Sequence, residues 1–175
     1  MKIGLTGTMS VGKTTLVNAL KKNKLFKDYN FATERSEYLM NLGIPLNTDS
    51  TLKGQTVFLA ERCAELMQDN IITDRTIIDV LAFTQTAKSI DQVEYESFEQ
   101  YAIQFLRDYD HIFYISPQGL DIEDNGVRET NEHFRDVIDF SIMNLLKRWG
   151  YRLNNVTEIS GTTKQRIKQI EESLS

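Results

Sequence analysis

One stretch near the N-terminus constrains this chain more than any other. Residues 7–14 read Gly-Thr-Met-Ser-Val-Gly-Lys-Thr, which fits the pattern G-x-x-x-x-G-K-[ST]. Residues 1–6 before it are partly apolar and compatible with a strand, and residues 15–22 after it carry apolar side chains at helical spacing. Strand, glycine-rich turn and helix are the setting in which this pattern forms a phosphate-binding P-loop.

The physical chemistry of a P-loop assigns a role to each part of the stretch. Gly7 and Gly12 allow backbone angles and close approaches that a side chain would forbid. The backbone N–H groups then face an anion, toward which the positive end of the following helix dipole also points. Lys13 is expected to bind the β- and γ-phosphates, and the hydroxyl of Thr14 to bind Mg²⁺. The predicted nucleotide-binding residues are Gly7, Thr8, Met9, Ser10, Val11, Gly12, Lys13, Thr14 and Thr15.

Composition narrows the class of protein. At 175 residues the chain is expected to form one domain, residues 1–175, and its 41% hydrophobic and 26% charged content is ordinary for a soluble globular protein. The net charge is −5, from 20 Lys and Arg against 25 Asp and Glu. This balance argues against broad, non-specific nucleic-acid binding, which depends on a positive field, although it leaves room for a local basic cleft.

A cytoplasmic protein is expected. The lone cysteine, Cys63, has no partner for an internal disulfide and is predicted to be a small buried residue. The first strand begins at the N-terminus, which leaves no room for a signal peptide, and no apolar run approaches the roughly 20 residues of a membrane span.

The chain alternates between predicted strands and helices. Strands are expected at 1–6, 29–33, 70–75, 110–116 and 151–159, and helices at 15–22, 36–41, 51–69, 76–88, 92–108, 130–149 and 162–174. The buried face of the helix over 51–69 is expected to carry Val57, Leu59, Ala60, Cys63, Ala64 and Met67. Such alternation predicts an α/β fold with a parallel sheet covered on both faces, whose ligand lies at the carboxyl ends of the strands.

Charged residues follow two of the predicted strands. Asp74 ends an apolar strand and is a candidate to hold Mg²⁺, and Arg75 beside it is a candidate to bind phosphate or orient an acceptor. Glu34 ends another strand, where a carboxylate could take the proton of an attacking hydroxyl, and Arg35 could hold an anionic group of the acceptor. The alternative is that both are solvent-exposed pairs.

Further candidates lie elsewhere in the chain. Arg128 and Arg135 share a helix face if the helix begins near Arg128, and could stabilise a transferred phosphoryl group, unless they are surface arginines. Gln55 and Phe58 could read a base by hydrogen bonding and stacking, or could simply pack in the fold. Asp79 could orient Arg75 or be an acid on a helix face. His111 and His133 have no metal-ligand spacing, and structural roles are expected for both.

These segments together resemble a known family. Residues 7–15, 34–39 and 71–79, with Asn125-Gly126-Val127-Arg128 and then Phe134-Arg135, resemble the P-loop kinase family that contains the nicotinamide riboside kinase domain. This family is often described as an AAA-domain ATPase group, and the resemblance spans nearly the whole chain. One departure is Asn125, which stands where the family often has Asp.

The resemblance implies a three-layer fold, a site and a reaction. It implies a five-stranded parallel sheet of order 2-3-1-4-5 with helices on both faces, a lid over about 117–135, and magnesium ATP as the phosphate donor. The implied catalytic residues are Lys13, Glu34, Asp74, Arg75, Arg128 and Arg135; the acceptor residues are Glu34, Arg35, Gln55, Phe58 and Arg75; and the metal-binding residues are Thr14 and Asp74. Glu34 and Asp74 could exchange roles, and the compact chain suggests a bacteriophage source.

Three functions are compatible with these residues. The leading one is a kinase that moves the γ-phosphate of ATP to a nucleoside, a nucleotide or a related small acceptor. A second is a kinase whose acceptor is DNA, at a 5′ end or a hydroxymethylated base, which predicts a basic groove using Lys21, Lys22, Lys24 and Lys27. A third is a regulatory ATPase. The Asp74-Arg75 pair at the end of its strand and the expected lid favour phosphoryl transfer over a nucleotide-dependent switch.

Overall fold

A computed structural model describes residues 1–33, 35–117 and 132–175 of the protein. Its strands are β1 (Lys2–Thr6), β2 (Asn30–Ala32), β3 (Ile71–Asp74), β4 (His111–Ile115) and β5 (Val156–Ile159). They form one five-stranded sheet in the order β2-β3-β1-β4-β5, and every neighbouring pair runs parallel. The parallel sheet and the implied strand order are therefore confirmed.

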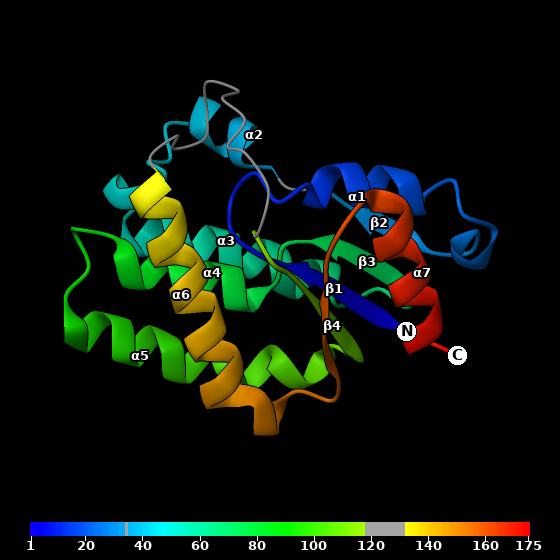
Figure 1. The fold of residues 1–175 in the computed structure, drawn as a ribbon. Coiled ribbons are helices and arrows are strands. Elements are labelled where there is room, and N and C mark those ends of the chain that lie inside the picture. The colour runs from blue at the N-terminus through cyan, green and yellow to red at the C-terminus, as the bar shows by residue number, and fades with distance from the viewer. Residues whose placement is uncertain (34, 118–131) are drawn as a thin grey trace.

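Helices connect these strands (Figure 1). They are α1 (Lys13–Leu20), α2 (Ser36–Asn41), α3 (Leu52–Glu65), α4 (Ile77–Thr86), α5 (Gln92–Ala102), α6 (Glu132–Trp149) and α7 (Thr163–Ser173). Short 3₁₀ helices, η1 to η4, cover Lys24–Phe26, Asn47–Asp49, Ile103–Asp108 and Gly150–Arg152. Some predicted elements were too long. The helix expected over 51–69 ends at Glu65, the helix expected over 92–108 changes to η3 after Ala102, and the last strand begins only at Val156, since η4 covers Gly150–Arg152.

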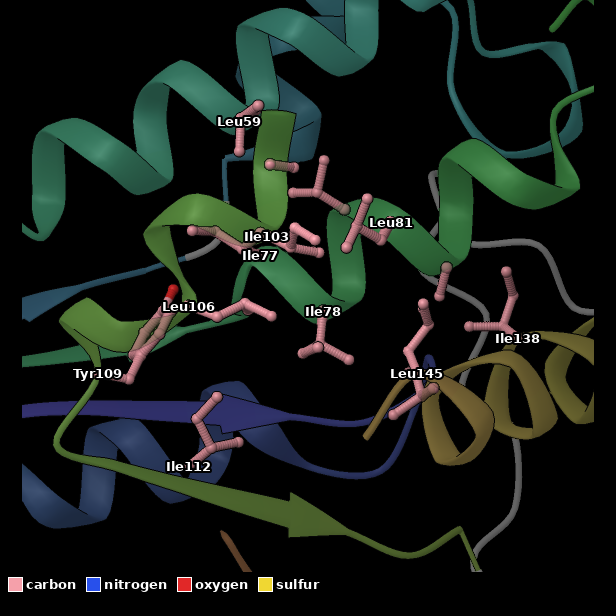
Figure 2. Packing of buried hydrophobic residues seen from close by; sticks show 14 of the residues in the cluster. Leu59, Ile77, Ile78, Leu81, Ile103, Leu106, Tyr109, Ile112, Ile138 and Leu145 are labelled. Carbon is pink, nitrogen blue, oxygen red and sulfur yellow. The ribbon is translucent and has the colours of Figure 1, made fainter. Parts of the chain in front are cut away.

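Both faces of the sheet are covered, and the alternation of side chains along β4 shows how. Phe113 and Ile115 join the hydrophobic cluster beneath α1 and α7, whereas Ile112 and Tyr114 join the larger cluster beneath α3 to α6. Figure 2 shows this larger cluster, in which side chains from α3, α4, η3 and α6 meet over β4. The fold is therefore three-layered, as implied.

Helix α3 buries only part of the face that was predicted. Its buried residues are Gly54, Gln55, Leu59 and Arg62, while Ala60 and Ala64 are exposed and Met67, beyond the end of the helix, is 84% exposed. Cys63 is half-buried rather than buried. Leu59 is buried as predicted. The prediction was wrong for Ala60, Ala64 and Met67 because it considered apolar residues alone, whereas the side chains of Gln55 and Arg62 are buried as well.

The register of the sheet brings the charged end of β3 to the P-loop. Leu5 of β1 pairs with Asp74 of β3, so the loop that follows Thr6 begins beside this carboxylate. The two chain termini lie close together at the opposite end of the strands, away from the P-loop (Figure 1). Within the described residues, no helix has both the length and the apolarity that crossing a lipid bilayer requires.

Candidate active site

The P-loop connects β1 to α1 and is anchored in both hydrophobic clusters. Met9 packs into the cluster beneath α3 to α6, and Val11 into the cluster beneath α1 and α7. Gly7 (φ 154°) and Gly12 (φ 80°) adopt the positive φ values expected of them, and Ser10 has φ 59°. A Cβ on Gly7 would lie 2.8 Å from the carbonyl oxygen of Ile115, so glycine is required for the loop to pass β4 at this distance.

Lys13 lies at the centre of this loop. Its side chain is 6% exposed, and its Nζ donates to the carbonyl oxygens of Gly7 at 2.6 Å and Thr8 at 2.7 Å. Lys13 is also the first residue of α1, where the helix dipole favours a bound anion. The loop therefore gathers an ammonium group and a helix N-terminus at one point.

Thr14 and Asp74 lie together beside the loop. The Thr14 hydroxyl donates to Oδ2 of Asp74 at 2.6 Å, and Asp74 is 1% exposed. Oδ1 of Asp74 is buried without a hydrogen-bond partner among the described residues. A hydroxyl and a carboxylate with an unused oxygen suit Mg²⁺, which takes a few protein oxygens and completes its shell with water and phosphate. No cage of three or more His, Cys, Asp or Glu exists in the described ranges.

Arg75 links two pockets. One pocket of about 270 Å³ is lined by Met9–Thr14, Asp74 and Arg75, and a second of about 420 Å³ includes Arg75, Gln55 and Phe58 in its wall. Arg75 has φ 92°, which is rare and costly for a residue with a side chain, at about 1–3 kcal/mol. Its guanidinium lies 5.0 Å from the centre of the Phe83 ring. Arg75 is therefore held where the pocket at the P-loop and the larger pocket meet.

Asp79 joins the parts of this site, a role that the sequence left open. The side chain is fully buried, and Oδ2 accepts from the hydroxyl of Thr6 at 2.7 Å and from the backbone N–H of Thr76 at 2.8 Å. Oδ1 accepts from the backbone N–H of Gly7 at 3.3 Å and lies 3.8 Å from Nη1 of Arg75. One carboxylate thus connects β1, the P-loop, the N-terminus of α4 and Arg75.

The larger pocket contains residues that the sequence did not indicate. It is lined by Ser36, Leu46, Asn47, Ser50, Gln55, Phe58, Arg62, Arg75, Asp79, Val80 and Phe83. Gln55 and Phe58 were predicted, and the structure brings them together with Arg75. Arg62 was missed, although its spacing of seven from Gln55 places both on one face of α3. Ser50 contributes a buried hydroxyl with no hydrogen-bond partner among the described residues.

Arg62 forms the polar wall of this pocket. It is 1% exposed, and its Nη2 donates to Oε1 of Glu65, one turn along α3, with Glu61 also within 3.9 Å. Burial raises the pKa of the Glu65 carboxyl, although Arg62 opposes this shift. The guanidinium therefore reaches the pocket held by a carboxylate behind it.

Comparison with known proteins identifies the family of the chain. A family model described as an AAA domain matches residues 2–166, almost the whole chain. The chain belongs to this AAA-domain family. No curated protein matches its sequence.

Solved structures resemble this AAA-domain protein in fold. Deoxyadenosine kinase from M. mycoides with bound dCTP has a TM-score of 0.69 at 20% identity, covering 99% of this chain and 98% of that one. Thymidylate kinase from Candida albicans has a TM-score of 0.71 at 16% identity, covering 98% and 89%. NadR protein in complex with NR has a TM-score of 0.76 at 19% identity, covering 97% of this chain and 50% of that one. At such identities the likeness establishes a P-loop kinase fold.

The remaining predicted site residues of the AAA-domain protein differ in what the structure says of them. Arg135, in the first turns of α6, is tied to the P-loop, since its carbonyl oxygen accepts from the Thr8 hydroxyl at 3.0 Å. Arg35 forms an ion pair with Glu61 at 3.1 Å, lies over the Tyr38 ring, and is not among the residues that line the larger pocket. Glu34 and Arg128 lie outside the described residues, as does the loop expected over 117–130 except for its first residue.

The basic groove that a DNA acceptor predicts is not supported. Lys21, Lys22, Lys24 and Lys27 follow the C-terminal end of α1, whereas the P-loop adjoins its N-terminal end. His111 has the expected structural role: it bonds with Thr157 of β5 at 2.9 Å and stacks on Phe113.

Proposed function

We propose that this protein is a kinase that transfers the γ-phosphate of magnesium ATP to a hydroxyl or phosphate group of a nucleoside, nucleotide or related small molecule. The observation that carries this proposal is the pair of pockets that meet at Arg75. One is polar and built from the P-loop, and the other is lined by the rings of Phe58 and Phe83 together with polar side chains. Phosphoryl transfer needs this juxtaposition, because catalysis depends on positioning the two substrates and stabilising charge between them.

The donor side is the P-loop. Lys13 and the N-terminus of α1 would hold the β- and γ-phosphates, and Thr14 and Asp74 would hold Mg²⁺. The bound cation would neutralise charge that develops on the phosphate oxygens. Because Oδ2 of Asp74 already accepts from Thr14, we assign Asp74 to the metal and Glu34 to the proton of the acceptor hydroxyl. Arg75 would contact the transferred group, with Arg128 and Arg135 closing from the lid side.

The acceptor side is the larger pocket. Phe58 and Phe83 offer ring faces on which a base can stack, and the buried amide of Gln55 offers both a donor and an acceptor to a base edge. Arg62 and Ser50 supply further polar groups at the same wall. The structural neighbours include a deoxyadenosine kinase and a thymidylate kinase, which supports a nucleoside or nucleotide as the acceptor.

A transfer screen with radiolabelled ATP tests this proposal. Nucleosides, nucleoside monophosphates, nicotinamide riboside, and normal and hydroxymethylated DNA serve as acceptors, and the Lys13→Ala variant serves as the inactive control. We expect label to move to a small nucleoside or nucleotide and the variant to be inactive but folded. Transfer only to DNA would support the second function, and hydrolysis that no acceptor stimulates would support the regulatory ATPase.

We further propose that residues 1–175 act as one kinase domain. The cytoplasmic location and the bacteriophage source stay predictions from the sequence.

A further inference from the structure

Arg166 of α7 contacts the back of the P-loop. Its Nη1 donates to the carbonyl oxygen of Val11 at 2.6 Å, although the two residues are 155 positions apart in the sequence. The side chain is 4% exposed, and α7 packs along α1, as Figure 1 shows. Within the described residues, no carboxylate forms an ion pair with Arg166, and its Nε has no hydrogen-bond partner.

Through the geometry of the peptide group, this contact also determines the direction of the next N–H group of the P-loop. The peptide between Val11 and Gly12 is trans, so its C=O and its N–H point in opposite directions. A hydrogen bond that fixes the carbonyl of Val11 toward α7 therefore also fixes the N–H of Gly12 away from α7. A Cβ on Gly12 would lie 3.3 Å from Nη1 of Arg166, so the guanidinium also lies directly against this glycine.

The charge of Arg166 is the second part of the argument. An arginine side chain stays protonated in proteins, so a cation is buried here, and burial lowers its pKa from the ordinary value. A carbonyl oxygen compensates a buried cation only in part. A polyphosphate on the opposite side of the same peptide would add the missing negative charge.

We propose that Arg166 is a positioning residue for the phosphates of ATP, acting through the Val11–Gly12 peptide of the P-loop. It orients the Gly12 N–H toward the phosphates and places a buried positive charge behind them. The C-terminal helix is thereby part of the nucleotide site. This inference rests on the proposed function, since it assumes that the P-loop binds ATP.

The test compares equilibrium binding of two ligands by titration calorimetry. The ligands are AMP-PNP with Mg²⁺ and the acceptor identified by the transfer screen, and the variants are Arg166→Met, which keeps the length without the charge, and Arg166→Lys, which keeps the charge. Lys164→Ala is the matched control, because Lys164 is an exposed cation on the same turn of α7. We expect Arg166→Met to weaken AMP-PNP binding about tenfold, equivalent to about 1.4 kcal/mol. Acceptor binding should stay within twofold, and Arg166→Lys should recover part of the loss.

Each outcome decides the inference. A folded Arg166→Met variant that binds AMP-PNP as tightly as the unaltered protein overturns it, and so does a variant that loses both ligands equally, since that is the result of a merely structural role. If the methionine variant does not fold, Arg166→Lys decides: unchanged AMP-PNP binding overturns the inference, and selective weakening supports it. If the unaltered protein binds no AMP-PNP, the proposed function itself fails, and this inference with it.

Discussion

Asp74 is the last residue of β3, Arg75 and Asp79 follow it, and each of the three has different contacts. Asp74 accepts from Thr14, Arg75 lies between the two pockets, and Asp79 binds the backbone around the P-loop. Two contacts hold Arg75 at its positive φ. Its backbone N–H donates to the carbonyl oxygen of Leu5, and its guanidinium forms an ion pair with Asp79. At the scale of single residues, the site therefore depends on one buried carboxylate that is not itself expected to react.

Replacing Asp79 with asparagine tests this dependence. The amide would turn a donor toward groups that now donate to the carboxylate, so a buried hydrogen bond is lost, and so is the charge that faces Arg75. We expect the free energy of unfolding to fall by about 1–3 kcal/mol and the rate of transfer to fall with it. Denaturant titration and the transfer assay measure the two effects. Asp69→Asn, an exposed position after α3, is the control; equal stability of the two variants would contradict the role of Asp79.

The proton of the acceptor hydroxyl gives a second prediction for single residues. Glu34→Gln should lower the single-turnover rate of transfer by about 10²–10⁴-fold if Glu34 is the general base. Binding of AMP-PNP should be unchanged in this variant, because the P-loop is intact. Asp74→Asn should instead raise the Mg²⁺ concentration that the reaction requires. A near-normal rate for Glu34→Gln would transfer the base role to Asp74.

At the scale of elements, α1 begins at the P-loop on one face of the sheet, whereas α3 and α4, which line the larger pocket, and α6 pack on the other face. The N-terminal end of α6 lies at the P-loop through Thr8, and its C-terminal end is fixed to α5. There the buried Glu99 accepts from Tyr95, Arg148 and Trp149. Burial raises the pKa of the Tyr95 hydroxyl, with Glu99 adding to the shift, so this tyrosine stays a hydrogen-bond donor. The helix that presents Arg135 is thus held at both ends.

Glu99→Ala should loosen the far end of α6. Removing the carboxylate leaves the Tyr95 hydroxyl and the Trp149 indole N–H without their acceptor, and we expect a loss of about 1–3 kcal/mol in the free energy of unfolding. Trp149 is the one tryptophan of the chain, so its fluorescence reports this region directly. Gln100→Ala, the next position on α5 and exposed, is the control. The hypothesis fails if the fluorescence and the unfolding midpoint match those of the control.

At the scale of the whole molecule, the sheet separates two hydrophobic clusters, and β5 forms one of its edges. His111 couples β4 to this edge strand through Thr157. Burial lowers the pKa of His111 below its ordinary value of 6.5, because the folded protein disfavours the charged imidazole.

The stability of the molecule should therefore depend on pH through His111. The unfolded chain binds a proton more readily than the folded one, so the stability that neutral His111 contributes is present above pH 6.5 and is lost as the pH falls toward its lowered pKa. His111→Gln should show a smaller loss of unfolding free energy over this acid range, measured by denaturant titration at a series of pH values. His133→Gln, at an exposed position on α6, should leave the loss unchanged. The same pH slope in both variants would refute this role.

Much of the fold could be predicted because its signals are local. Each of these signals occupies only a few consecutive positions: the glycines of the P-loop, the apolar and polar runs, and the charged residues at the end of β3. The parallel topology follows from the alternation of predicted strands and helices. The boundaries of α5 and β5 were less accurate, because competition between α and 3₁₀ turns is decided by packing. The buried face of α3 was predicted only in part for a related reason. Gln55 and Arg62 are stable inside the fold because they line a pocket and because Glu65 accepts a hydrogen bond from Arg62.

By itself, the sequence determined a phosphate-binding loop between a strand and a helix, in a parallel α/β protein with acids and bases near the loop. The tertiary structure alone decided which of these groups meet. Asp79 binds Thr6 and Gly7 from more than 70 residues away, and Arg166 reaches Val11 across 155. No periodic pattern in a sequence indicates contacts of this kind, because they depend on how the packing of the sheet places separate elements.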